Sequence, residues 1–183
     1  MFTFNDKKDR EIQVCRFEEK DAADLLEYYR AETHVVTMNE RFCGPLTEQA
    51  VKQHIAGSQE NCIFLCIRAE GRVIGFVRFD RLTGTFCKSA EISFGLLYDY
   101  WRNKILEVVI SHAVDYVFKN YDIVRIFYEN YSRDLGSCYI LMDCGFQRDG
   151  VLRSCAYNSG IMSDVTIFSL LFSDVRPIIT VKK

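Results

Sequence analysis

The sequence of 183 residues lacks several features that mark special classes of protein. It contains only two prolines and no low-complexity stretch, so nothing in it indicates a linker between domains. No apolar run reaches the ~18 residues that a membrane-spanning helix needs. We therefore expect one domain over residues 1–183, with no membrane-spanning segment.

Charge of either sign is not in excess. The chain carries 23 basic and 25 acidic residues, which give a formal net charge of -2 at pH 7. No strongly basic field exists to hold nucleic acid or an anionic membrane surface. This balance favours small molecules or proteins as partners and argues against nucleic acid.

The N-terminal stretch MFTFNDKKDR has no apolar segment that could act as a signal peptide. We therefore interpret the eight cysteines as free thiols in a reducing compartment and expect a cytoplasmic protein. The closest pair, Cys62 and Cys66, has even spacing in the apolar run CIFLCI, which places both on one face of a strand. Two buried core residues explain this pair better than a metal site does.

Apolar spacing in the first half predicts helices and then strands. Residues 11–17 are predicted to form a strand and residues 18–33 a helix, and Thr47 is a plausible N-cap for a helix that stops near Gly57. Turn signals at Glu70-Gly71 and Thr83-Gly84 separate the next apolar runs, which are 62–68, 73–81 and 90–97. These runs predict an antiparallel meander.

The second half predicts a helix over 104–120, from its apolar stripe, and a strand over 123–128. A strand, a helix and a next strand imply a parallel crossover. A short helix over 134–144 that ends at Gly145 and two final strands, 146–157 and 164–172, complete the chain. The order is neither a strict βα repeat nor all-β, so we expect an α/β fold with a mixed sheet flanked by helices, which leaves several folds open.

The residues from Ala90 onward narrow the choice. Three segments carry the signal: AEISFGLLYDYWRNKILEVVISHAVDYVF, IVRIFYENYSRDLGSCYILMDCGF and GVLRSCAYNSGIMSDVTIFSLL. Their spacing resembles that of the GNAT superfamily of N-acetyltransferases, and is most similar to the branch that includes the ribosomal-protein alanine acetyltransferases. The resemblance covers residues 12–172. It implies a mostly antiparallel central sheet with two splayed central strands, and direct transfer of an acetyl group from acetyl-CoA to a primary amine of a protein N-terminus or a small molecule.

The resemblance also implies where acetyl-CoA would lie. Its pantetheine arm would bond exposed backbone groups between the splayed strands, as an added strand would, lined by Phe94, Gly95, Leu96 and Leu97. A loop of the form Gln/Arg-x-x-Gly-x-Gly/Ala would then hold the pyrophosphate at a helix N-terminus, and its binding residues here would be Arg102, Asn103, Lys104 and Ile105. An Asn and a Ser that contact the cofactor in this branch correspond to Asp134 and Ser137.

The loop departs from the family pattern, because Arg102 and Lys104 replace both glycines and Asp99 replaces the leading Gln/Arg. A side chain can obstruct the approach of phosphate to the backbone, and it adds strain where φ must be positive. Two cations beside a helix N-terminus can also attract a pyrophosphate. The sequence therefore leaves open an active enzyme, a non-catalytic binding module of the same fold, or a protein for another acyl group or phosphorylated ligand.

Candidate catalytic residues follow from the same resemblance. Glu91 matches the family's common AEI-type glutamate and is the best placed general base. A backbone N–H near Leu96 would stabilise the oxyanion. The tyrosine that many members use as an acid is replaced by Leu141, which leaves Ser137, a water or no acid to protonate the thiolate.

The acceptor is not named by the sequence. Tyr29 and residues 38–42 correspond to the helix-loop region that closes the acceptor site in the family. An α-amine, with a pKa near 7.7 to 8.0, needs less catalytic help than a lysine amine near 10.4. We expect a monomer or a homodimer.

Overall fold

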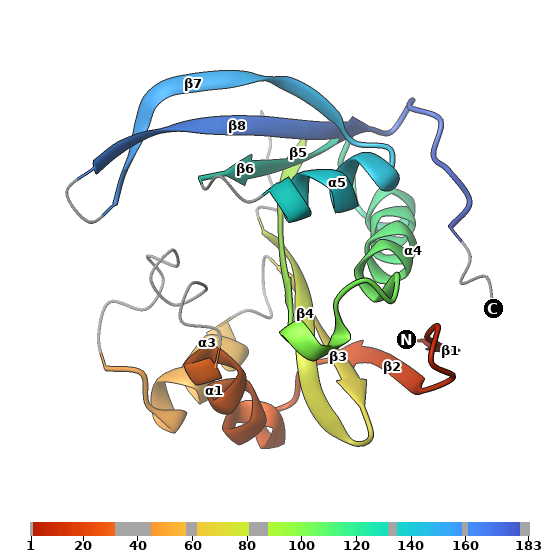
Figure 1. Cartoon of the computed structure of the whole chain (residues 1–183), viewed down its shortest axis with the longest axis vertical. Helices are drawn as coiled ribbons and strands as arrows, with labels where there is room; N and C mark the ends of the chain where they lie inside the picture. Colours follow the sequence, from red (N-terminus) through yellow and green to blue (C-terminus); the bar gives the residue numbers. More distant parts are fainter. Residues whose placement is uncertain are drawn as a thin grey trace.

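The computed structural model describes residues 2–31, 45–57, 62–80, 88–131, 135–158 and 161–179. Within these ranges eight strands form one sheet in the order β1-β2-β3-β4-β5-β6-β8-β7 (Figure 1). The pair β5 and β6 is parallel, and every other neighbouring pair is antiparallel. The predicted mixed, mostly antiparallel sheet is thereby confirmed.

From β2 onward the elements follow the predicted order. The strands are β1 (Phe2–Asn5), β2 (Glu11–Arg16), β3 (Ile63–Ala69), β4 (Arg72–Asp80), β5 (Ser89–Leu96), β6 (Arg125–Asn130), β7 (Gln147–Asn158) and β8 (Ile161–Leu171). The helices are α1 (Ala22–Ala31), α3 (Glu48–Gly57), α4 (Ile105–Asn120) and α5 (Leu135–Asp143), with short 3-10 turns η1 (Glu19–Asp21) and η2 (Tyr98–Tyr100). None of these described helices is both long and apolar enough to cross a membrane.

Local signals explain several boundaries. The hairpin between β3 and β4 turns at Glu70 and Gly71, whose φ angles of 53° and 78° are the left-handed values that such a tight turn uses. Thr47 Oγ1 accepts a hydrogen bond from the Ala50 N–H at 3.2 Å, which confirms the predicted N-cap of α3. Gly145, with φ 92°, ends the turn after α5 as predicted.

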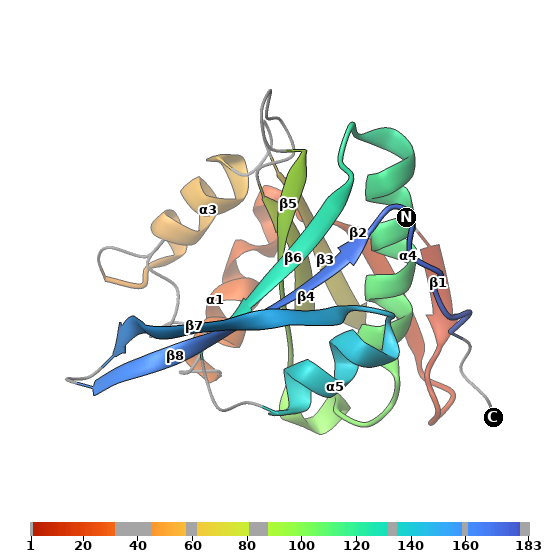
Figure 2. The ribbon, with the colours of Figure 1, turned by 90° about the horizontal axis from the view of Figure 1, so that it is seen from above.

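The sheet separates two hydrophobic cores. Figure 2 shows α1 and α3 on one side of the strands and α4 on the other. Alternating side chains of β4 divide accordingly: Val77 packs in the core beneath α4, and Phe76 packs in the core with α1 and α3. Cys62 and Cys66 are both buried in the second core, as their spacing predicts.

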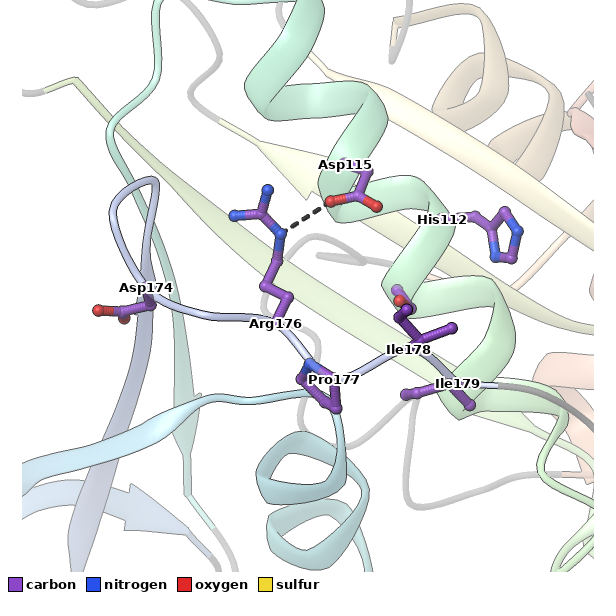
Figure 3. A pocket seen from close by; sticks show the side chains of 8 residues that line it. His112, Asp115, Asp174, Arg176, Pro177, Ile178 and Ile179 are labelled. Atoms are coloured by element: carbon purple, nitrogen blue, oxygen red, sulfur yellow. Dashed lines mark hydrogen bonds and ion pairs between the residues drawn. The ribbon is translucent and has the colours of Figure 1, made fainter.

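The C-terminal segment runs back over the outer side of α4 (Figure 3). Arg176 Nε donates to Asp115 Oδ1 at 2.8 Å, and its guanidinium lies 5.3 Å from the centre of the Phe118 ring. Asp115, Arg176, His112 and Pro177 line a groove on the side of α4 that faces away from the sheet. The segment therefore braces the helix from outside.

No strand is predicted before residue 11, and the structure corrects this omission. Residues Phe2–Asn5 form β1, which pairs with β2 through a turn organised by the fully buried carboxylate of Asp6. This carboxylate accepts hydrogen bonds from the N–H groups of Lys8 and Arg10 and from Arg10 Nε. Burial alone raises the pKa of Asp6, but the bonds from Arg10 and Lys8 lower it below its ordinary value.

We predict that Asp6→Asn lowers the free energy of unfolding at pH 7 by about 1.5–3 kcal/mol, because the half-buried Arg10 loses its charged partner. A lowered carboxyl pKa stabilises the fold above the unfolded-state value near 3.9, and this contribution is lost as pH falls through the folded-state value. The difference between the two proteins should therefore shrink below about pH 4. Urea titrations across pH measure it.

Asp9→Asn is the matched control, because Asp9 is exposed and, among the described residues, its carboxylate accepts a hydrogen bond only from Asn5 Nδ2, at 3.0 Å. Its left-handed φ of 63° also suits asparagine. Equal effects of the two substitutions at pH 7 would contradict the role given to Asp6.

Candidate functional site

The parallel ladder between β5 and β6 is short. It contains three residue pairs, which are Ser89↔Arg125, Ala90↔Ile126 and Glu91↔Phe127. Beyond them β5 continues to Leu96 along β4, and β6 continues to Asn130 along β8. We call the unladdered stretch, residues 92–96 of β5 and 128–130 of β6, the splay.

Backbone groups of β5 alternate between β4 and the splay. The Leu97 N–H donates to Ile74 O on β4 at 2.8 Å. Because successive residues of a strand direct their N–H and C=O groups to opposite sides, Gly95 also faces β4, and Phe94 and Leu96 face the splay. The carbonyl of Leu96 accepts a hydrogen bond from Trp101 Nε1 at 2.7 Å.

Side chains of β5 divide between the two faces of the sheet. Ile92 and Leu96 are buried in the core beneath α4. Gly95 lies on the opposite face, where a Cβ would collide with the hydroxyl of Tyr28 on α1. Glu91 therefore faces the side of α1 and α3. On the α4 side, the rings of Phe94 and Tyr128 stack with their centres 5.3 Å apart and connect β5 with β6.

The loop between β5 and α4 has a left-handed backbone at two positions. Arg102 has φ 62° and Lys104 has φ 61°. These are the positions at which the predicted phosphate loop has glycine, the residue that adopts such angles without strain. The backbone conformation that the glycines serve is thus present without them, at a cost of roughly 1–2 kcal/mol per residue.

Neighbouring side chains hold the loop in place. Asn103 is buried, with 7% of its surface exposed, and its Nδ2 donates to the carbonyls of Tyr100 and Trp101 at 3.2 Å. Ile105, the first residue of α4, is buried in the core. The Val108 N–H bonds to Lys104 O at 3.2 Å, which leaves the N–H groups at the start of α4 without a partner inside the helix.

The two cations of the loop differ in their contacts. Lys104 Nζ lies 2.5 Å from Asp143 Oδ2 and 3.1 Å from Glu107 Oε1. These bonds, that of Asp143 first, raise the pKa of Lys104. Arg102 is exposed and forms no hydrogen bond or ion pair with the described part of the chain. Lys104 therefore ties α4 to α5, and Arg102 is the cation left to meet an anion.

The predicted catalytic residues lie on opposite sides of the sheet. Glu91 is half-buried on β5, opposite Asp80 of β4. Ser137 is half-buried on α5, which packs against α4, and precedes Cys138, whose Sγ accepts from Asn130 Nδ2 at 2.9 Å. Asp134 and residues 38–42 lie outside the described residues.

Two other positions clarify the acid and the acceptor region. Leu141, which replaces the family tyrosine, is fully buried in the core, and the nearby Tyr139 is 62% exposed. Tyr29 is buried, packed against Phe76 in the core of α1 and α3. Among the described residues, Tyr29 therefore packs as a core residue.

The sequence patterns do not predict the pairing of Glu129 with Tyr131. The hydroxyl of Tyr131, just after β6, donates to Glu129 Oε2. Burial and then this carboxylate raise the pKa of Tyr131, followed by weaker effects of Glu91 and Cys155. Glu129 is two residues beyond Phe127, the ladder partner of Glu91. Only the register of β6 against β5 places these carboxylates on one face.

The acetyltransferase (GNAT) domain model matches residues 12–147. The chain belongs to the GNAT acetyltransferase family. It is 31% identical over 99 residues to the uncharacterised N-acetyltransferase YoaA of Bacillus subtilis (strain 168), a match over 54% of this chain and 55% of YoaA. The chain thus spans about half the length of that relative.

Solved structures of GNAT proteins share the fold. Mycobacterium smegmatis RimJ, solved in complex with CoA-disulfide, superposes with a TM-score of 0.80 at 15% identity, over 93% of this chain and 86% of that one. The ribosomal-protein-S5-alanine acetyltransferase of Vibrio fischeri has a TM-score of 0.80 at 19% identity, over 97% and 100%. The predicted family and fold are confirmed.

We predict that Arg102→Gly gives a more stable protein than Arg102→Ala, by roughly 0.5–1 kcal/mol, because alanine keeps a Cβ on a left-handed backbone. At Glu27, exposed within α1, the order should reverse by about 1 kcal/mol, because glycine is the poorer helix former. Urea unfolding of the four variants measures both differences. A preference for alanine at both positions would contradict the loop conformation.

Proposed function

We propose that the protein transfers the acetyl group of acetyl-CoA directly to a primary amine. The observation that carries the proposal is the left-handed backbone of Arg102 and Lys104 at the start of α4, next to the splay. It supports a pyrophosphate loop that keeps its shape although both glycines are absent. The GNAT family and the CoA-bound state of the RimJ structure support the choice of co-substrate.

The residues present fit a CoA species. The N–H groups at the start of α4, which have no partner inside the helix, and the exposed guanidinium of Arg102 suit the pyrophosphate. The splay-facing backbone groups of Phe94 suit the amides of the pantetheine arm, and the N–H of Leu96 suits the acetyl carbonyl, since the Leu96 carbonyl already accepts from Trp101 Nε1. Ser137, on α5, adds a hydroxyl on the same side of the sheet as α4. We retain Asn103 as a residue that shapes the loop, because its side chain is already bonded to the loop carbonyls.

Acetyl-CoA supplies an activated acetyl thioester. Because the loop belongs to the α4 side, a pantetheine arm that passes through the splay presents its thioester toward the α1 and α3 side, where Glu91 lies. Glu91 removes a proton from the acceptor amine, directly or through one water, as the amine attacks the carbonyl carbon. The Leu96 N–H donates to the oxyanion that forms.

Collapse of this adduct breaks the C–S bond and releases CoA as a thiolate. Ser137, on the side from which the thiolate leaves, is our candidate for passing a proton to it. A thiol of pKa near 8.5 also leaves tolerably without an acid. The buried leucine at position 141 is therefore compatible with catalysis.

The alternative function, a non-catalytic GNAT-fold binding module, was motivated by the missing glycines. The left-handed angles of Arg102 and Lys104 argue against a collapsed loop and favour the enzyme. Two departures from the family pattern still favour the binding module: Leu141 in place of the tyrosine and Asp134 in place of the asparagine.

We predict that the protein releases CoA from acetyl-CoA only when an amine is present, and that Glu91→Gln lowers kcat by about 10²–10⁴-fold, because a positioned base is lost. The affinity for acetyl-CoA should change little, since Arg102 and the α4 N–H groups that suit the pyrophosphate lie on the other side of the sheet from Glu91. A thiol-detecting assay over a panel of α-amines and alkylamines, with calorimetry for the affinity, measures both quantities. Acetyl-CoA binding without turnover of any amine would favour the binding module.

A further inference from the structure

Glu129 and Tyr131 lie where an acceptor would reach the splay. Glu91 is the last ladder residue of β5, and its partner Phe127 is followed two positions later by Glu129. Residues two apart on a strand share a face, so Glu129 lies on the α1 and α3 side, as Glu91 does. The opening of the splay thus has one carboxylate on each strand.

Two described cations of this face, Arg78 and Arg125, already have carboxylate partners. Arg78 Nε donates to both carboxylate oxygens of Asp80 at 3.0 Å, and Arg125 bonds to Asp149 Oδ2 at 2.7 Å. Glu129 is half-buried and forms no ion pair within the described residues. Its oxygen accepts a hydrogen bond from the Tyr131 hydroxyl, a neutral donor. The charge of Glu129 is therefore held in place without being neutralised.

The state of Tyr131 supports this arrangement. Its pKa is raised by burial and by the neighbouring carboxylate, so the hydroxyl stays protonated and remains a donor at neutral pH. A carboxylate so fixed pairs with an ammonium group at a smaller cost in side-chain entropy than a free one does.

We propose that Glu129, positioned by Tyr131, binds a second positive charge of the acceptor, so that the enzyme prefers primary amines that carry another cationic group. The substrate class is thereby narrowed to aliphatic diamines and amines of similar charge. Glu91 serves the reacting amine and Glu129 the second ammonium group. The inference rests on the proposed function, because that function decides where the acceptor enters. The splay itself does not depend on it, since the splay begins where the ladder between β5 and β6 ends.

The test compares two probes of equal chain length, 1,5-diaminopentane and pentylamine, on the CoA-saturated protein by calorimetry. The full chain should bind the diamine at least about tenfold more tightly, a ratio that fits one charge-assisted contact. Glu129→Gln should bring the ratio close to one and leave the affinities for CoA and pentylamine unchanged. Tyr131→Phe should lower the ratio in part, and salt should lower it in the unmodified protein.

Glu11→Gln is the control, because Glu11 is exposed on β2, far along the sheet from β6, and should keep the full preference. Equal binding of the two probes, no binding of either, or a preference that survives in Glu129→Gln would overturn the proposal. Because the CoA complex cannot turn over, the result is independent of catalysis. If the protein acetylates amines without preferring diamines, the proposed function stands and the role of Glu129 is wrong. If diamines bind through Glu129 but no amine is acetylated, the role of Glu129 stands and the proposed function is wrong.

Discussion

The three-pair ladder between β5 and β6 is the constraint on which the rest of the site depends. Both strands are paired over six residues with an antiparallel neighbour, β5 with β4 and β6 with β8. Parallel pairing is slightly weaker per residue, and the twist of each half carries the two strands apart. The sheet therefore opens at its one parallel pair. Beyond the ladder, the backbone groups of β5 that face the splay do not pair with β6. The loop that leads to α4 follows directly after this stretch of β5.

That loop shows how a fold keeps a conformation after losing the residues that make it easy. Two left-handed residues cost a few kcal/mol together, by the usual estimate of roughly 1–2 kcal/mol each. The bonds of Asn103 to two loop carbonyls, of Trp101 to Leu96 and of Lys104 to the acids of α4 and α5 offset this cost. Lys104 thus stands where the family pattern has a glycine, and its side chain connects α4 with α5. The exposed side chain of Arg102 has no such partner in the described residues.

Periodicity and the family resemblance predicted most of the fold, because α4, the Glu70-Gly71 turn and the cap at Gly145 are encoded locally. Strand β1 escaped prediction because four residues carry too short an alternation, and its turn depends on the pairing of the buried Asp6 with Arg10. The candidate site was predictable along β5 and the loop, where residues match a motif. The direction of the Lys104 side chain and the pairing of Glu129 with Tyr131 were not, since both depend on contacts between elements distant in sequence. Asp134 and residues 38–42 remain predictions outside the described residues.

The central claim is that a glycine-free loop still holds the pyrophosphate of CoA. Calorimetric titration of the unmodified protein with CoA, repeated as a melting shift, tests it most directly. We predict saturable binding of one CoA per chain, with stability raised by about 2.7 kcal/mol at a ligand concentration of a hundredfold the Kd. The absence of binding and of any melting shift at millimolar CoA would contradict the claim.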